Sequence, residues 1–147
     1  MSRIVLLDAG PIGLVTNPKR SEMALACAQW LQSSIAQNTR IVVPEIADYE
    51  VRRELLRARK TKGLAKLDSL IEILDYLPLT TEVMRRAASL WAKARQQGQP
   101  TAGDKTIDAD VILAAQAASL GDSAVIATTN VGHLKRFVSA ELWQDLQ

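Results

Sequence analysis

The chain has 147 residues, a formal net charge of +2 and 48% hydrophobic residues, a composition typical of a globular protein that buries a core, so we expect one domain over residues 1–147. No apolar run approaches the ~20 residues that span a bilayer, no export signal is recognisable, and the lone Cys27 fits a reducing compartment, so we expect a cytoplasmic protein. The single cysteine and single histidine exclude a two-histidine acid–base pair and the usual zinc sites. We expect that histidine, His133, at the surface or in a helix cap.

The first half of the chain alternates between strand and helix patterns. An apolar run over residues 3–8 predicts a strand that ends in Asp8, and the Ala-Gly-Pro sequence after it predicts a turn. Apolar residues at helical spacing predict a helix over 21–37, with Ser21 as its cap. The next elements are a β-branched strand and two helices, expected over 40–44, 45–60 and 64–73.

The second half continues the alternation. A weaker strand pattern covers 73–79, a helix is expected from Thr80 or Thr81 to about Gln97, and glycines and a proline predict a loop over 96–106. A helix, a strand, a turn and a short final helix follow, the first three over 107–120, 123–129 and 130–132. This order predicts an α/β fold with a parallel sheet and helices on both faces.

Polar residues follow two predicted strands, at the edge where open parallel sheets bind ligands. Asp8 ends the first strand, and Asn130 comes two residues after Thr128 in the last predicted strand. Glu50 lies one turn into the helix after the second strand, and three acids surround the start of the helix over 107–120, namely Asp104, Asp108 and Asp110. If the first and last predicted strands are neighbours, these groups converge, and Mg²⁺ or Mn²⁺ would offset their repulsion and activate water against a phosphodiester.

Each of these residues also has an ordinary structural explanation. Asp8 and Asn130 both suit turns. Glu50 lies within reach of Arg53 and Arg57 on its own helix, which is typical of a solvated ion pair. Asp108 and Asp110 suit a helix N-terminus, where negative charge is favoured. The joint pattern, rather than any one residue, favours a site.

Four sequence blocks, in order along the chain, resemble the PIN-domain family of metal-dependent ribonucleases, notably the compact bacterial toxins of the VapC type. LLDAGPI is similar to the family's opening strand, with its metal-binding aspartate at Asp8. PEIADYEVRREL resembles the second block, with the glutamate at Glu50, and DADVILAAQA resembles the third, with the acid at Asp110. VIATTNVGHL resembles the last block, which brings Thr128 and Asn130 to the site.

This resemblance implies a three-layer α/β/α fold, endoribonuclease activity, and a Mg²⁺ or Mn²⁺ ion held by Asp8, Glu50 and Asp110. In toxin members a small antitoxin blocks the site. Asn130 replaces the aspartate of many members and would assist through its carbonyl or a bound water, which weakens the case for a second metal. Asp108 is the alternative third ligand, because residues two apart on a helix point roughly 200° from each other and only one of the two faces the ion. The resemblance favours Asp110 and leaves Asp108 as a first-turn helix acid.

Two further patterns concern partners. A basic run offers a surface for RNA phosphates, or equally a solvated helix face, and no aromatic residue lies within it to stack a base; its members are Arg52, Arg53, Arg57, Arg59, Lys60, Lys62 and Lys66. The segments over 23–35 and 83–94 carry more apolar residues than one buried stripe needs, which predicts a homodimer or a groove covered by an antitoxin. No membrane partner is expected.

Other classes with an aspartate after the first strand fit less well. Haloacid-dehalogenase-type phosphatases need a second acid two residues later, where the chain has Gly10. Phospho-receiver domains need an acidic pair before that aspartate, where the chain has Arg3 and Ile4. We therefore predict a Mg²⁺- or Mn²⁺-dependent endoribonuclease of the toxin type. The alternative is a PIN-like nucleic-acid- or protein-binding module with little catalysis.

Overall fold

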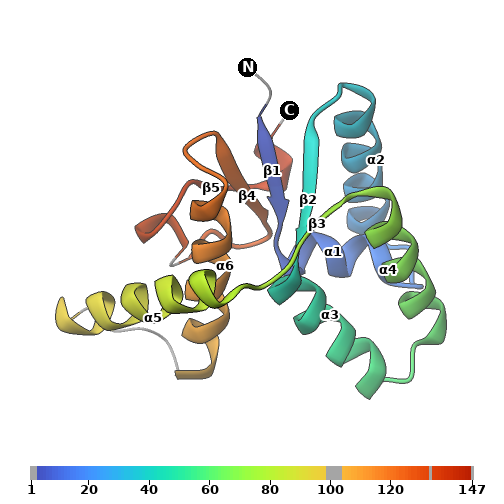
Figure 1. The fold of residues 1–147 in the computed structure, drawn as a ribbon. Coiled ribbons are helices and arrows are strands. Elements are labelled where there is room, and N and C mark those ends of the chain that lie inside the picture. Colours follow the sequence, from blue (N-terminus) through green and yellow to red (C-terminus); the bar gives the residue numbers. More distant parts are fainter. Residues whose placement is uncertain (1–2, 99–103, 133, 147) are drawn as a thin grey trace.

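The computed structural model describes residues 3–98, 104–132 and 134–146, so His133 and part of the predicted 96–106 loop lie outside the described residues. These residues form a five-stranded parallel sheet in the order β3-β2-β1-β4-β5. The strands are β1 (Ile4–Leu7), β2 (Arg40–Pro44), β3 (Asp75–Leu77), β4 (Ala124–Thr128) and β5 (Ala140–Leu142). Central β1 pairs with both β2 and β4, so the carboxyl ends of these three strands meet at one edge of the sheet (Figure 1).

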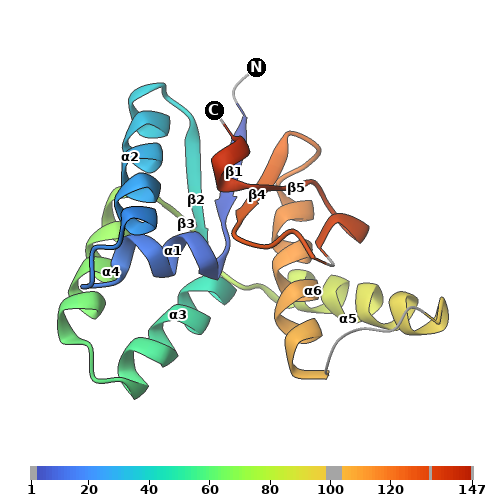
Figure 2. The same ribbon diagram turned by 180° about the vertical axis from the view of Figure 1, so that it is seen from behind.

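Helices cover both faces of the sheet, which gives the three-layer α/β/α arrangement (Figures 1 and 2). On one face lie α1 (Ala9–Thr16), α2 (Glu22–Ala36) and α4 (Thr61–Ile73). Alternate strand residues point to this face, where buried Val5, Leu7 and Val43 pack with apolar side chains of these helices.

The opposite face is covered by α6 (Asp104–Ser119) and by the 3-10 helix η1 (Leu134–Arg136). Leu6 and Ile126 pack there against Leu113 of α6. The long α5 (Thr81–Gln96) packs on α6 and projects away from the sheet, as Figure 2 shows. A final 3-10 helix, η2 (Trp143–Asp145), returns to the first face against α2.

α3 (Glu45–Arg57) begins at the end of β2 and extends beyond the sheet edge, beside α4. It contributes Val51 and Leu55 to the core on the α2 side and Ile46 to the core on the α6 side. Since both cores hold this helix, its orientation relative to the end of β1 is fixed.

The turn predicted after Asp8 is wrong, because the chain there forms α1. The carboxylate of Asp8 accepts a hydrogen bond from the backbone N–H of Ala9 at 2.7 Å and caps this helix. Pro11 is tolerated because it lies in the first turn, where a proline lacks only an N–H that has no helical partner. Gly10 and Gly13 lower the helix propensity of the segment, which hid the helix from the sequence pattern.

Three other boundaries differ from the sequence prediction. α6 begins at Asp104, three residues before the predicted start, so Asp108 is not the first-turn acid expected of it. α3 ends at Arg57 and α4 already begins at Thr61. In addition, no strand was predicted for β5, which has only three residues and follows a 3-10 helix. No helix in the described part of the chain is long and apolar enough to cross a membrane.

Candidate active site

A cavity of about 500 Å³ opens at the carboxyl edge of the sheet, between the ends of β1 and β4, α3 and the start of α6. It contains every acid that the resemblance assigned to the site, together with one arginine. The polar residues of its lining are Asp8, Glu50, Arg53, Asp110, Thr128, Thr129 and Asn130. Segments more than a hundred residues apart in sequence therefore meet here, as the predicted adjacency of the first and last strands required.

Asp8 is fixed at the floor of this cavity by contacts to both carboxylate oxygens. Its Oδ1 accepts from the N–H of Ala9 at 2.7 Å, and its Oδ2 accepts from the hydroxyl of Thr128 at 2.7 Å. Burial raises the pKa of Asp8, and these two hydrogen bonds only partly oppose the shift. The carboxylate is therefore held in one orientation, with lone pairs left over toward the cavity.

Glu50 projects from α3 into the same cavity. Burial, and then the negative charge of Asp8, raise its pKa to about 7, while Arg53 opposes the shift and Asp110 adds to it. The sequence also allowed a solvated ion pair between Glu50 and an arginine. Such a pair does not set the pKa of Glu50, because burial and the nearby acids raise this pKa more than Arg53 lowers it. Burial, together with the negative charges of Asp8 and Asp110, therefore disfavours the ionised form of Glu50.

The structure distinguishes Asp108 from Asp110, the two candidates for the third metal ligand. Asp110 is half-buried, lines the cavity and acts electrostatically on Glu50. Asp108 is exposed, and the cavity lining, as far as the chain is described, does not include it. The side chain of Asp104 lies outside the described part of the structure. Asp110 thus stands where the resemblance assigned the third acid, and its role as a ligand stays a prediction.

The loop after β4 closes the cavity against the start of α1. The hydroxyl of Thr128 accepts from the N–H of Asn130 at 3.1 Å, so the same hydroxyl that donates to Asp8 also shapes this loop. A Cβ on Gly10 would overlap the side chain of Thr129, so only glycine allows the loop and α1 to approach this closely. Asn130 is exposed at the rim. The sequence pattern missed the contact between Gly10 and Thr129, for which a Gly-Pro dipeptide gives no specific signal.

Comparison with known proteins decides the family. The profile of the PIN domain family matches residues 5–136. The chain belongs to the PIN domain family. No curated protein matches the sequence significantly.

Solved structures that share this PIN fold include complexes of the VapBC and Fit types. A chain of VapBC2 from Rickettsia felis, bound to a DNA fragment from its promoter, aligns with a TM-score of 0.72 at 20% identity over 95% of this chain and 98% of that one. A chain of FitAcB from Neisseria gonorrhoeae aligns with a TM-score of 0.72 at 23% identity, over 97% and 99%. VapBC-5 from Mycobacterium tuberculosis, of the VapBC family of toxin–antitoxin systems, aligns with a TM-score of 0.58 at 20% identity, over 95% and 97%.

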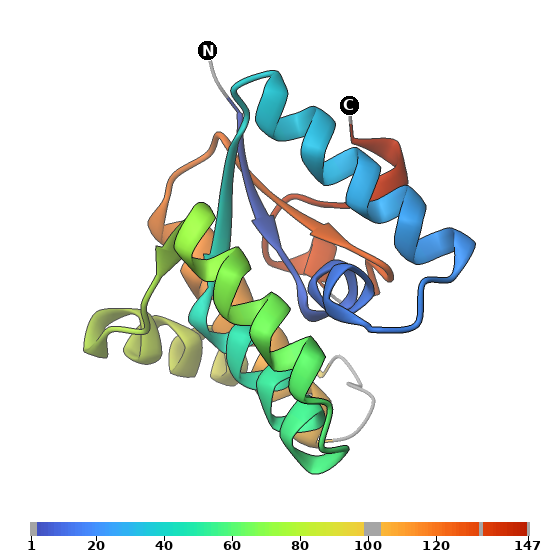
Figure 3. The ribbon, with the colours of Figure 1, turned by 90° about the vertical axis from the view of Figure 1, so that its right-hand side faces the viewer.

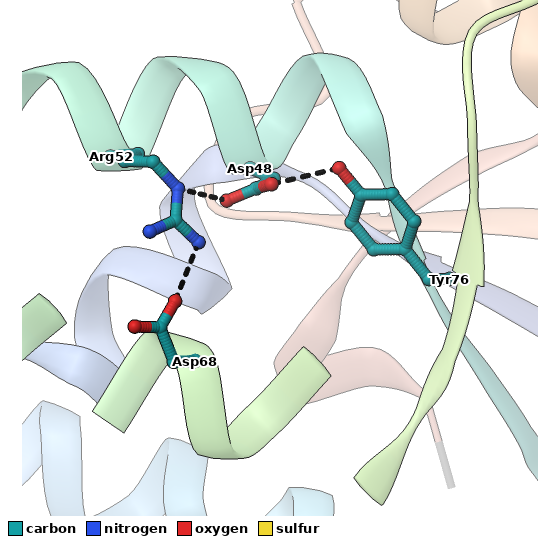
Figure 4. Close-up of polar contacts among 4 residues, drawn as sticks. All are labelled: Asp48, Arg52, Asp68 and Tyr76. Atoms are coloured by element: carbon teal, nitrogen blue, oxygen red, sulfur yellow. Dashed lines mark hydrogen bonds and ion pairs between the residues drawn. The ribbon is translucent and has the colours of Figure 1, made fainter. Parts of the chain in front are cut away.

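A polar network on the far side of α3 holds this helix of the PIN domain in place (Figure 4). Arg52 binds Asp48 at 3.0 Å and reaches Asp68 of α4 at 2.9 Å, and the hydroxyl of Tyr76 in β3 donates to the other oxygen of Asp48 at 2.8 Å. Figure 3 shows α4 lying along α3, which is the pair that Arg52 links. Asp48 and Arg52 are therefore engaged in orienting α3, and the network leaves Glu50 on the cavity side.

Gln116, a buried residue of α6, fixes the first turn of α3. Its Oε1 accepts from the N–H of Ile46 at 3.3 Å, and its Nε2 donates to the carbonyl of Leu77 at 2.8 Å. The carboxylate of Glu45 also accepts from the N–H of Leu79, at 2.6 Å. The start of the helix that presents Glu50 is thus tied to α6 and to the segment after β3.

The side chains of the predicted basic run make different contacts. Arg52 serves the network just described, and Arg57 pairs with Glu54 at 2.8 Å on the exposed side of α3. Arg53 alone among these residues lines the acidic cavity, and it also lines an adjoining groove of about 380 Å³ between α1 and α3. Lys60 lies at the far end of that groove.

The donor set of the cavity fits a hard divalent cation. All the potential ligands are oxygen atoms, burial raises the pKa values of Asp8 and Glu50, and the charges of Asp8 and Asp110 add to the shift of Glu50, so a cation would stabilise the ionised carboxylates. Within the described residues no three acidic, histidine or cysteine side chains are arranged to hold an ion directly. Mg²⁺ commonly keeps several of its waters, so an acid of the cavity can hold such an ion directly or through a bound water.

Proposed function

We propose that this chain is a Mg²⁺- or Mn²⁺-dependent endoribonuclease, organised as one PIN-like domain over residues 1–147 and acting in the cytoplasm as the toxin of a type II toxin–antitoxin pair. The observation that carries the proposal is the meeting of Asp8, Glu50 and Asp110 in one cavity at the carboxyl edge of the sheet. Membership of the PIN domain family supports it.

The side chains have distinct tasks in this proposal. Asp8, Glu50 and Asp110 would hold the ion, with Asn130 assisting through its carbonyl or a water. A bound ion polarises the phosphodiester and lowers the pKa of the attacking water. Thr128 keeps the Asp8 carboxylate in place by its hydrogen bond to Oδ2.

Arg53 is the one positively charged side chain that lines the cavity, as far as the chain is described. Its guanidinium offers two parallel donors to a phosphate oxygen, and a positive charge here offsets the repulsion between the acids and an anionic substrate. In this proposal the half-buried acids bind the ion, and the arginine orients the phosphate for attack.

The test is cleavage of labelled single-stranded RNA oligonucleotides of varied sequence by the purified protein. We expect cleavage with Mg²⁺ or Mn²⁺ and none in EDTA, with a single-stranded DNA of the same sequence as the control substrate. Full cleavage in EDTA would refute the mechanism. Metal binding by calorimetry without cleavage of any RNA would favour the alternative, a PIN-like binding module.

We propose in addition that a small cognate antitoxin covers the site. VapBC-5 from Mycobacterium tuberculosis, which shares the fold, is a toxin–antitoxin system, and this similarity supports the proposal. Exposed apolar side chains on α2 and α5 offer further area for the antitoxin or for a second copy of the chain; they are Met23, Leu25, Ile35, Met84 and Trp91.

Light scattering and co-purification test these partners. A monomer at tens of micromolar, with no small protein that co-purifies from the native host, would count against both the antitoxin and the homodimer. A small open reading frame directly upstream in the genome would support the antitoxin.

A further inference from the structure

An exposed aromatic ring lies beside Arg53, the arginine that lines the acidic cavity. Tyr49 of α3 directly precedes Glu50, and 56% of its surface is exposed. The guanidinium carbon of Arg53 lies 5.1 Å from the centre of the tyrosine ring, within the range of a cation–π contact. Tyr49 lies just before the basic run, so the sequence alone did not group it with those residues.

Arg53 connects this ring to the cavity. On an α-helix, Arg53 lies about 40° around the axis from Tyr49 and about 60° from Glu50, on the arc between them. The same guanidinium therefore contacts the tyrosine ring and lines the cavity that holds Asp8 and Asp110. A nucleotide whose phosphate reaches Arg53 has its base within reach of the ring.

The surroundings of Tyr49 favour a nucleic acid over an apolar protein surface. Of its neighbours three and four positions away on the helix, Ile46 is buried, and the others are the charged residues Glu45, Arg52 and Arg53. The exposed ring therefore stands among charges rather than within an apolar patch. A ring held by an arginine is the arrangement that single-strand-binding proteins use to stack bases without reading their sequence.

We propose that Tyr49, held by Arg53, is a stacking platform for one base of a single-stranded RNA substrate, next to the phosphate that enters the acidic cavity. The inference rests on the proposed ribonuclease function and names how that site holds its substrate. Arg53 contacts the phosphate and one part of the ring, and the base stacks on the exposed part. Tyr49 is a binding residue, which acts on substrate affinity and not on the chemical step.

The experiment measures binding of a single-stranded RNA that carries 2-aminopurine, whose fluorescence is quenched by stacking, in EDTA so that cleavage does not proceed. We expect Tyr49→Ala to weaken binding about 5- to 100-fold and to lose the quenching, whereas Tyr49→Phe keeps both. Leu56→Ala is the matched control, since Leu56 lies on the same helix and is 58% exposed. In cleavage assays with Mg²⁺, Tyr49→Ala should raise KM and leave kcat nearly unchanged.

An oligonucleotide with an abasic site in place of the stacked base sharpens the test, because removal of the base should make the wild type and Tyr49→Ala bind equally. Unchanged affinity of Tyr49→Ala, or equal losses in Tyr49→Ala and Leu56→Ala, would overturn the platform. So would a loss of antitoxin binding in Tyr49→Ala with RNA binding intact, which would assign the ring to a protein interface. Absence of RNA binding and cleavage by the wild type would instead overturn the proposed function itself.

Discussion

Replacement of Glu50 by glutamine is expected to stabilise the metal-free protein at pH 8 and to have little effect at pH 4.5. Burial and the charge of Asp8 raise the pKa of Glu50 from 4.5 to about 7. Between these pH values the folded protein holds more protons at this site than the unfolded chain, so the free energy of unfolding falls as the pH rises through this window. Glutamine cannot ionise, so the variant avoids the penalty.

The size of the effect follows from the shift and from the exposure of the carboxyl. Each unit of pKa difference corresponds to about 1.4 kcal/mol if it acts in full. Glu50 is only half-buried, and solvent screens a large part of the interaction, so we take about 1 kcal/mol at pH 8. For a domain of this size, that gain raises Tm by about 2–4 °C.

The assay is a thermal melt followed by circular dichroism, in EDTA, at the two pH values. Glu54→Gln is the matched control on the same helix, because Glu54 is exposed and its hydrogen bond to Arg57 lowers its pKa, so this variant should gain nothing at pH 8. Mg²⁺ at pH 8 should stabilise the wild type more than Glu50→Gln. Equal Tm values of wild type and Glu50→Gln at pH 8, or the same gain at both pH values, would refute the reasoning.

Three further predictions concern the cavity and its supports. Asp110→Asn should abolish RNA cleavage with the fold intact, while Asp108→Asn should keep most of the cleavage activity. Cleavage rates and thermal melts of both variants test this prediction, and the opposite ranking of the rates would make Asp108 the ligand. Gly10→Ala should cost about 1–3 kcal/mol by clash with the loop after β4, and its control Gly13→Ala, with nothing within 4 Å of the new Cβ, should not destabilise; urea melts with equal losses would exclude the clash. Tyr76→Phe should lower the free energy of unfolding by about 1 kcal/mol, because it removes the hydrogen bond to Asp48 of α3. An unchanged urea midpoint would show that this bond does not stabilise the protein.

Strands β1 to β4 could be predicted from the sequence because each of them carries its own local signal. The strand predicted over 40–44 matches β2 residue for residue, since β-branched residues fill it and helix α3 begins directly after its proline. The helix cap predicted at Ser21 is confirmed, and of the two predicted starts of the next helix, Thr80 and Thr81, the cap is Thr80. Each cap side chain accepts a hydrogen bond from an N–H three residues later. Local chemistry of this kind is readable without the fold.

The features that the sequence did not predict depend mainly on contacts between distant segments rather than on local chemistry. α1 is held by its cap and by packing of buried Ile12, which outweigh the poor helix propensity of its two glycines. The close approach of Gly10 to Thr129 and the contact of Arg53 with Tyr49 depend on tertiary placement and on side-chain rotamers. The meeting of Asp8 with Asp110 was predictable only through the expected strand order and the family resemblance.

Asp8 has two tasks, as the cap of α1 and as an acid of the cavity, and this has a consequence for the way such chains lose activity over time. A lineage released from selection for catalysis still needs a cap for α1, and loss of an aspartate cap to alanine costs about 0.5–2 kcal/mol. Among the described residues Glu50 caps no helix, and its charge weakens the metal-free protein. Drift should therefore discard the glutamate early and the aspartate late, so that retention of the glutamate is the better sign of a working nuclease among divergent copies of this fold.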